Sequence, residues 1–191
     1  MRIRKIVCVI IALLTLCGCG SVDSSVLNYA ERSFCADVEG QVDGLDFAAR
    51  VQVSAPGEDN THTAQTAHTA QSAQKPQSVR SVRSVRVEFS SPESLRGIVV
   101  TKGAEGTSIS LDGTVISDAA AQGWLIIAQL LIPEGQVVSI KKSEGETATA
   151  TVALDSKQTI VIDLNTGAPL EASVDGARSA FVRVTRFEYV E

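Results

Sequence analysis

Apolar and polar residues alternate along the chain from position 34 onward, with a period of two. Over residues 34–42 and 45–53 most alternate positions are apolar, and the dipeptide Asp43-Gly44 stands between the two runs. A period of two is typical of a strand with one buried face, and Asp-Gly favours a two-residue hairpin turn. The pattern therefore predicts a β-hairpin at the start of the folded domain.

The same alternation continues to the C-terminus and is interrupted by turn residues. Dipeptides such as Ser91-Pro92 and Asp112-Gly113 separate adjacent runs. We expect further strands at residues 85–89, 95–102, 107–111, 114–117, 137–142, 147–154, 158–164, 170–174 and 181–190. Strands that follow one another at about 8 to 12 residues favour an antiparallel meander, and no segment has the pattern of a βαβ unit.

Residues 21–33 and 118–132 depart from this pattern and predict helices. The second segment, DAAAQGWLIIAQLLI, is apolar on nearly every side and is closed by Pro133. An apolar helix must be covered on most sides, and a curved sheet wrapped around it offers that cover. The predicted fold class is therefore mainly β (α+β): a strongly curved antiparallel sheet, or unclosed β-barrel, with an N-terminal helix and a central apolar helix on its concave face.

The central helix has two interpretations. Its apolar side chains are either plain core or the lining of an apolar cavity, and the free volume between helix and sheet distinguishes the two. In the second interpretation the cavity is lined by Trp124, Leu125, Ile127, Leu130 and Leu131.

Low-complexity sequence interrupts the strand pattern at about residues 56–84. Two similar hexads begin at His62 and His68, and the tripeptide Ser-Val-Arg then occurs three times in succession. A segment with so few bulky apolar residues cannot offset its ordering entropy by burial, so we expect a disordered insertion. Two histidines without a third ligand or a fixed geometry do not predict a metal site.

Lys75, Arg80, Arg83 and Arg86 form the one run of positive charge beyond the N-terminus. With a period of three, the arginines are expected along one side of an extended, polyproline-like segment, and anionic lipid headgroups are a candidate partner. The other interpretation, which we favour, is a solubilising segment that leads into the next strand.

The N-terminus carries the pattern of an export signal. Three basic residues, Arg2, Arg4 and Lys5, precede the apolar run Ile6–Leu16, which is too short to span a bilayer. The tetrapeptide that ends at Cys19, Leu-Cys-Gly-Cys, resembles the lipobox of bacterial lipoproteins, which is cleaved before a cysteine that carries acyl chains.

We therefore predict a signal peptide at 1–18, a palmitate-type lipid anchor on Cys19, a short tether over 19–23 and a single domain over 24–191. Such a protein is held at the extracytoplasmic side of the cell membrane. About five residues of tether would keep the domain close to the membrane surface.

Charge and residue types exclude several functions. The first 18 residues hold three of the 17 basic residues and none of the 22 acidic ones, so the remainder has a formal charge of −8, which disfavours nucleic acid as a partner. Cys35 is the one thiol left for redox chemistry; it is expected on a polar strand face without a basic neighbour. No nucleophile elbow, phosphate loop or metal-binding helix motif is present, so we predict a non-enzymatic protein without a cofactor or a metal.

Two short motifs support a family resemblance. The stretch FSSPESLR, Phe89 to Arg96, and the turn SLDGTVI, Ser110 to Ile116, precede the apolar helix, and together with the exported N-terminus they resemble the LolA/LolB superfamily. These proteins carry or receive bacterial lipoproteins in an unclosed, curved β-barrel lidded by helices. The chain is more similar still to small LolA-like bacterial lipoproteins such as the germination lipoprotein GerS. Ser91 stands where the soluble carrier of the superfamily has an arginine, so the resemblance implies the fold more directly than transport.

Two classes of function remain. The first is an envelope interaction or scaffold protein, anchored to the membrane and filled by its own side chains. The second is a protein that binds or transfers a lipid, an acyl chain or another apolar ligand in the concave cavity. We favour the scaffold, because core packing explains an apolar helix without any ligand.

Overall fold

The computed structural model describes residues 24–56, 83–116, 119–133, 135–143, 145–153, 156–176 and 178–190. The expected signal peptide, the expected lipid anchor on Cys19 and most of the insertion, with His62 and His68, lie outside these residues. In chain order the elements are η1 (Ser24–Glu31), β1 (Phe34–Val42), β2 (Leu45–Val53), β3 (Val85–Ser91), β4 (Val99–Gly103), β5 (Gly106–Leu111), β6 (Thr114–Ile116), η2 (Ala119–Leu125), α2 (Ile126–Leu131), β7 (Gln136–Lys142), β8 (Thr147–Ala153), β9 (Lys157–Asp163), β10 (Pro169–Asp175) and β11 (Ala180–Tyr189), where η marks a 3-10 helix.

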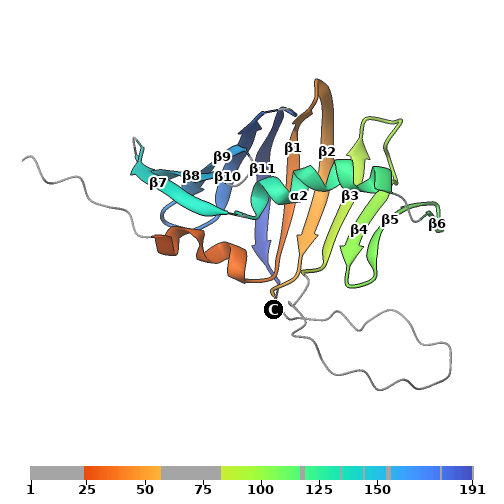
Figure 1. Cartoon of the computed structure of the whole chain (residues 1–191), viewed down its shortest axis with the longest axis horizontal. Helices are drawn as coiled ribbons and strands as arrows, with labels where there is room; N and C mark the ends of the chain where they lie inside the picture. Colours follow the sequence, from red (N-terminus) through yellow and green to blue (C-terminus); the bar gives the residue numbers. More distant parts are fainter. Residues whose placement is uncertain are drawn as a thin grey trace, which may run out of the picture.

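The strands form one antiparallel sheet in the order β6-β5-β4-β3-β2-β1-β11-β10-β9-β8-β7. Strands β1 to β6 and β7 to β11 each make a meander, and the pairing of β1 with β11 joins the two. The sheet is curved and does not close, so β6 and β7 are its free edges (Figure 1). The predicted fold class, a strongly curved and unclosed antiparallel sheet, is confirmed.

The Asp-Gly dipeptides make the two tight turns that the sequence predicts. Asp43 and Gly44 have φ angles of 50° and 84°, and Asp112 and Gly113 have φ angles of 49° and 80°. Positive φ at both central positions is the type I′ geometry that matches the twist of a hairpin, and aspartate and glycine tolerate it.

Strand β4 is shorter than predicted. The sequence favours a strand from Leu95, but the strand begins at Val99. The backbone N–H of Leu95 donates to the carbonyl of Pro92, and that of Ile98 donates to the carbonyl of Leu95, so consecutive turns occupy this segment. Local turn hydrogen bonds after Pro92 thus take the place of the strand-to-strand hydrogen bonds expected before Val99.

The segment from η2 to α2, which we call the crossing helix, runs over the concave face of the sheet (Figure 1). Because β6 and β7 are consecutive in sequence but lie at opposite edges, their connection has to cross the whole sheet. α2 packs on β9, β10, β11, β2 and β3, whereas η2 packs on β4 and β5. The helix expected over 118–132 is thus confirmed in position, but its first half is 3-10, the helix type common at N-terminal ends.

One hydrophobic core lies between the sheet, the crossing helix and η1. On β1, β2 and β3 alternate side chains face this core, as the period of two requires. Its largest completely buried side chains include Phe34, Phe89, Ile127, Leu131, Ile160 and Ile162.

The two ends of the insertion lie side by side. The backbone N–H of Ser54 donates to the carbonyl of Ser84 at 2.9 Å, and the N–H of Ser84 donates to Ser54 Oγ at 2.8 Å. The insertion therefore starts and ends within one hairpin, where a longer loop changes the closure entropy only slowly. Its disorder remains a prediction.

The arginines of the Ser-Val-Arg repeats do not share one side. Arg86 is on the outer face of β3 beside Glu88, whereas Arg83 approaches Glu31 of η1 on the concave side. Arg86 lies on β3 and points outward, whereas Arg83 precedes the strand and reaches toward η1, so the one-sided basic stripe is wrong for these two residues.

Candidate functional site

The five residues predicted to line a cavity all lie on the crossing helix and face the sheet. Leu125, Ile127, Leu130 and Leu131 are buried in the core. Trp124 is half-buried, and its ring lies 5.1 Å from the ring of Phe89 in an edge-to-face contact. The structure therefore brings these residues together against the concave face, and it packs four of them among the core side chains.

Two side chains hold the C-terminal end of the crossing helix through its backbone carbonyls. Nε2 of Gln158 on β9 donates to the carbonyls of Gln129 and Leu130 at 3.1 and 2.6 Å. The Tyr29 hydroxyl on η1 donates to the carbonyl of Leu131 at 2.8 Å. The last carbonyls of a helix have no partner within it, so these bonds complete the helix end. The sequence gives no signal for them, because donor and acceptor lie up to 102 residues apart.

A third donor, Arg178, ties the first half of the crossing helix to the rim of the sheet. Its Nη1 donates to the carbonyl of Gly123 at 3.0 Å, and its Nη2 forms an ion pair with Asp43 at 2.7 Å. A Cβ at Gly123 would lie 3.3 Å from Arg178 Nη1, so glycine gives the guanidinium room. One arginine thus joins the turn of the first hairpin, the β10–β11 connection and η2.

Tyr29 is a buried titratable group in contact with the crossing helix. Burial raises the pKa of its phenol above the usual range, and the nearby Tyr189 raises it further, whereas Arg83 acts in the opposite direction. Its ring also packs edge-to-face on Phe34 and Phe187. The neutral hydroxyl is therefore the form that the fold requires.

Stability should accordingly fall as the pH rises past about 10, where the phenol ionises in the unfolded chain. The folded state keeps its proton there, so the free energy of unfolding decreases by up to about 1.4 kcal/mol per pH unit. Tyr29→Phe should cost about 1 kcal/mol at neutral pH through the lost hydrogen bond and should remove this slope. Urea unfolding at about pH 8 and about pH 11 measures both. Equal slopes in the two proteins would contradict the assignment.

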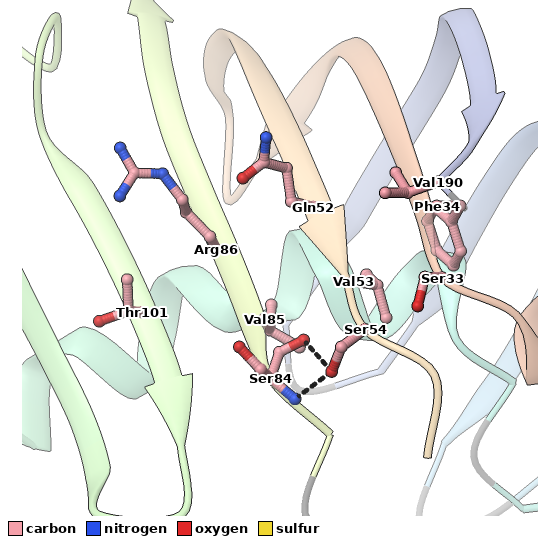
Figure 2. Close-up of a pocket in the computed structure, with 10 residues that line it drawn as sticks. All are labelled: Ser33, Phe34, Gln52, Val53, Ser54, Ser84, Val85, Arg86, Thr101 and Val190. Atoms are coloured by element: carbon pink, nitrogen blue, oxygen red, sulfur yellow. Dashed lines mark hydrogen bonds between the residues drawn. The ribbon is translucent and has the colours of Figure 1, made fainter. Parts of the chain in front are cut away.

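A hollow of about 370 Å³ lies on the outer face of the sheet, at the end of the β2–β3 hairpin where the insertion begins and ends (Figure 2). Many of its polar atoms already have partners: Ser33 Oγ accepts from the N–H of Ala55, Ser54 Oγ bonds Ser84, and Arg86 pairs with Glu88. The hollow is lined by Ser33, Phe34, Gln52, Val53, Ser54, Ser84, Val85, Arg86, Thr101 and Val190. The hydrogen bonds of Ser33 and Ser54 therefore hold the end of β2 to its neighbours.

The outer face of the central strands carries exposed ion pairs. Two further open hollows of about 580 and 600 Å³ lie among these side chains, away from the crossing helix. Ion pairs on this face join Arg183 to Glu171 at 3.0 Å and Arg50 to Asp37 at 3.9 Å. Exposed pairs of this kind contribute little to stability.

Cys35 is buried, and the expectation that it lacks a basic neighbour is wrong. Nε of Arg50 on β2 donates to Cys35 Sγ at 3.0 Å, reaching diagonally across the hairpin. This hydrogen bond is the main reason why the pKa of the Arg50 guanidinium is raised. The sequence does not reveal the contact, because a diagonal pair depends on the register of the hairpin.

Within the described ranges, no group of three or more histidine, cysteine, aspartate or glutamate side chains is arranged to hold a metal ion. Among the same residues, no helix has the length and apolar character needed to cross a membrane.

No family model matches the chain, and no curated protein matches its sequence. Solved structures do match its fold. An uncharacterized conserved protein from Thermus thermophilus superposes with a TM-score of 0.50 and 13% identity, over 87% of this chain and 85% of that one. At this identity the likeness is one of fold alone.

Two further matches are weaker. A chain of the Pseudomonas aeruginosa MucA/MucB complex has a TM-score of 0.42 and 16% identity, over 87% of this chain and 56% of that chain. A LolA superfamily protein from Nitrosomonas europaea has a TM-score of 0.37 and 11% identity, over 87% and 93% of the two chains. The expected architecture, an unclosed curved sheet with a helix across its concave face, is the fold of this chain, and a LolA superfamily protein is among the solved structures that it resembles. The narrower resemblance to GerS-like lipoproteins stays a prediction.

Proposed function

We propose that this chain is a membrane-anchored bacterial lipoprotein whose domain acts without catalysis as an interaction or scaffold protein in the cell envelope. The observation that carries the proposal is the packing of the concave face. Ile127 and Leu131 of the crossing helix are completely buried, and so are Val51, Val87 and Val182 on the strands beneath. An interior filled by its own side chains leaves the surface as the place where a partner binds.

The anchor is the other half of the proposal. It rests on the export signal and on the lipobox-like sequence that ends at Cys19, and it assigns the domain to the extracytoplasmic side of the membrane. Two acyl chains stabilise membrane attachment by about 0.8 kcal/mol per buried methylene, enough to make release negligible.

A Cys19→Ser variant should therefore leave the membrane fraction, because the sulfur that carries the lipid is absent. The measurement is fractionation of cells that express the wild type or the variant, with mass spectrometry of the N-terminal peptide. The wild type should carry acyl chains on Cys19.

Cys35→Ser is the matched control, since it also removes a thiol and should leave the protein in the membrane fraction. A Cys19→Ser variant that loses its signal peptide and still sediments with membranes would contradict the anchor.

Binding of an apolar ligand is the second candidate. It is favoured by the half-buried Trp124 and by the few polar contacts, from Tyr29, Gln158 and Arg178, that fix the crossing helix. A ligand in the concave site would have to displace this helix. Native mass spectrometry of the protein purified from its membrane tests this candidate, since a co-purified lipid other than the anchor would support it over the filled scaffold.

A further inference from the structure

Two arginines lie at the end of the sheet where η1 meets the central strands. Arg32 directly follows η1, and its guanidinium carbon lies 3.8 Å from the ring centroid of Tyr189. Arg83 lies just before β3, and 17% of its side chain is exposed. Ser33 links the elements around them, because its carbonyl accepts from the N–H of Val190 at 2.9 Å and its Oγ accepts from the N–H of Ala55 at 2.7 Å.

Arg83 is a mostly buried cation to which no anion among the described residues is hydrogen-bonded. Its Nη1 is buried and has no hydrogen-bond partner within the described ranges. The carboxylate of Glu31 lies 3.9 Å from its Nη2, beyond hydrogen-bond distance, and is itself 73% exposed. A guanidinium so withdrawn from water gains more from an added anion than a fully exposed arginine does.

The position of this end relative to the membrane follows from the anchor, so this step rests on the proposed function. Only residues 19–23 separate Cys19 from the start of η1, and five residues span at most about 18 Å. η1 and the ends of β11 and β2 lie on the same side of the molecule, opposite the turn of the first hairpin (Figure 1). Val190 is 53% exposed at this end and adds an apolar contact.

We propose that this end of the domain rests on the membrane surface, that Arg32 binds the phosphate groups of anionic phospholipids, and that the charge of Arg83 strengthens this attraction. A guanidinium matches a phosphate with two parallel hydrogen bonds; Arg32 is exposed and offers them directly, and Arg83 adds a positive charge that no hydrogen-bonded anion among the described residues offsets. The acidic remainder of the chain is repelled by the same lipids, so attraction at one end and repulsion elsewhere orient the domain.

The test uses the full lipidated protein in vesicles of phosphatidylcholine alone or of phosphatidylcholine with phosphatidylglycerol. A polarity-sensitive fluorophore is attached at Val190→Cys; the native Cys35 is buried. We expect its emission to shift to the blue and to rise about twofold only in the anionic vesicles, since Val190 then enters the interface. The same label at Glu93→Cys, on the exposed turn between β3 and β4, should not respond.

Removal of the two charges should abolish the response. Arg32→Gln combined with Arg83→Gln should give equal spectra in both vesicles, whereas Arg96→Gln, at an exposed ion pair near the opposite end, should behave as the wild type. Arg32→Gln alone keeps the core contacts of Arg83 and should reduce the response, so the inference does not depend on the folding of the double variant.

Three other outcomes would contradict either this inference or the lipid anchor. If the protein sediments with both kinds of vesicle but the Val190 label responds equally in both, the inference is wrong and the anchor stands. If it sediments with neither, the anchor is wrong. If inorganic phosphate with neutral vesicles reproduces the shift, the site binds a free anion and the proposed membrane contact is wrong.

Discussion

Leu131→Asp is expected to unfold the domain. Leu131 is completely buried at the end of α2, beneath the hydrogen bond between its own carbonyl and Tyr29. A carboxylate at this position has no partner and is removed from water, so we expect a loss of more than about 4 kcal/mol. Urea unfolding followed by the fluorescence of Trp124, the one tryptophan of the chain, measures the loss.

The same variant separates the two candidate functions. Gln129→Asp is the matched control, because Gln129 is exposed on the same helix and its substitution should change stability by less than about 1 kcal/mol. If the interior is filled, a dansyl-labelled fatty acid should not bind the wild type and Leu131→Asp should only unfold the protein. A folded Leu131→Asp variant that has lost fatty-acid binding would instead support the cavity and contradict the filled core.

Gly40→Ala should destabilise the domain by forcing β1 away from β11. A Cβ at Gly40 would lie 2.0 Å from the carbonyl oxygen of Phe181 and 2.9 Å from Cα of Val182, both in the backbone of β11. Neither atom can move without shifting the strand that joins the two meanders. Overpacking a core side chain costs about 1 to 3 kcal/mol, and a clash with backbone should reach or exceed the upper figure.

Gly103→Ala is the matched control for this substitution. Gly103 also lies on a strand, but a Cβ there has no atom within 4 Å, so we expect a change within about 0.5 kcal/mol. Thermal unfolding of both variants compares them, and hydrogen exchange on β1 and β11 shows where the loss occurs. A Gly40→Ala variant as stable as Gly103→Ala would contradict the close approach of the two strands.

The strands and their turns were predictable because they depend on neighbours in sequence. Alternation fixes which face of a strand is buried, and Asp43-Gly44 supplies the positive φ angles of a two-residue turn. The long apolar run after Trp124 likewise requires a covered helix wherever the chain places it. For the same reason the five predicted apolar residues of the crossing helix all lie against the sheet.

Gly40 is a position at which the sequence hints at a close contact without identifying the partner. Glycine inside a strand often marks a close approach of another backbone, but it does not say which one. The partner is Phe181, 141 positions later in the numbering, and only the folded sheet identifies it.

The sequence by itself determined the strands, the hairpin turns and the apolar helix, since each is a property of a short segment; the export signal is a prediction of the same kind. The tertiary structure alone decided that β1 pairs with β11, that the helix crosses the concave face, and that Tyr29, Gln158 and Arg178 hold it there. A period of two selects the buried face of a strand but not its neighbour, and side-chain donors find distant carbonyls only after the sheet has curved around the helix. Arg83 shows the same limit, because the sequence predicts its positive charge, and only the fold places that charge near Glu31 of η1 with no hydrogen-bonded anion among the described residues.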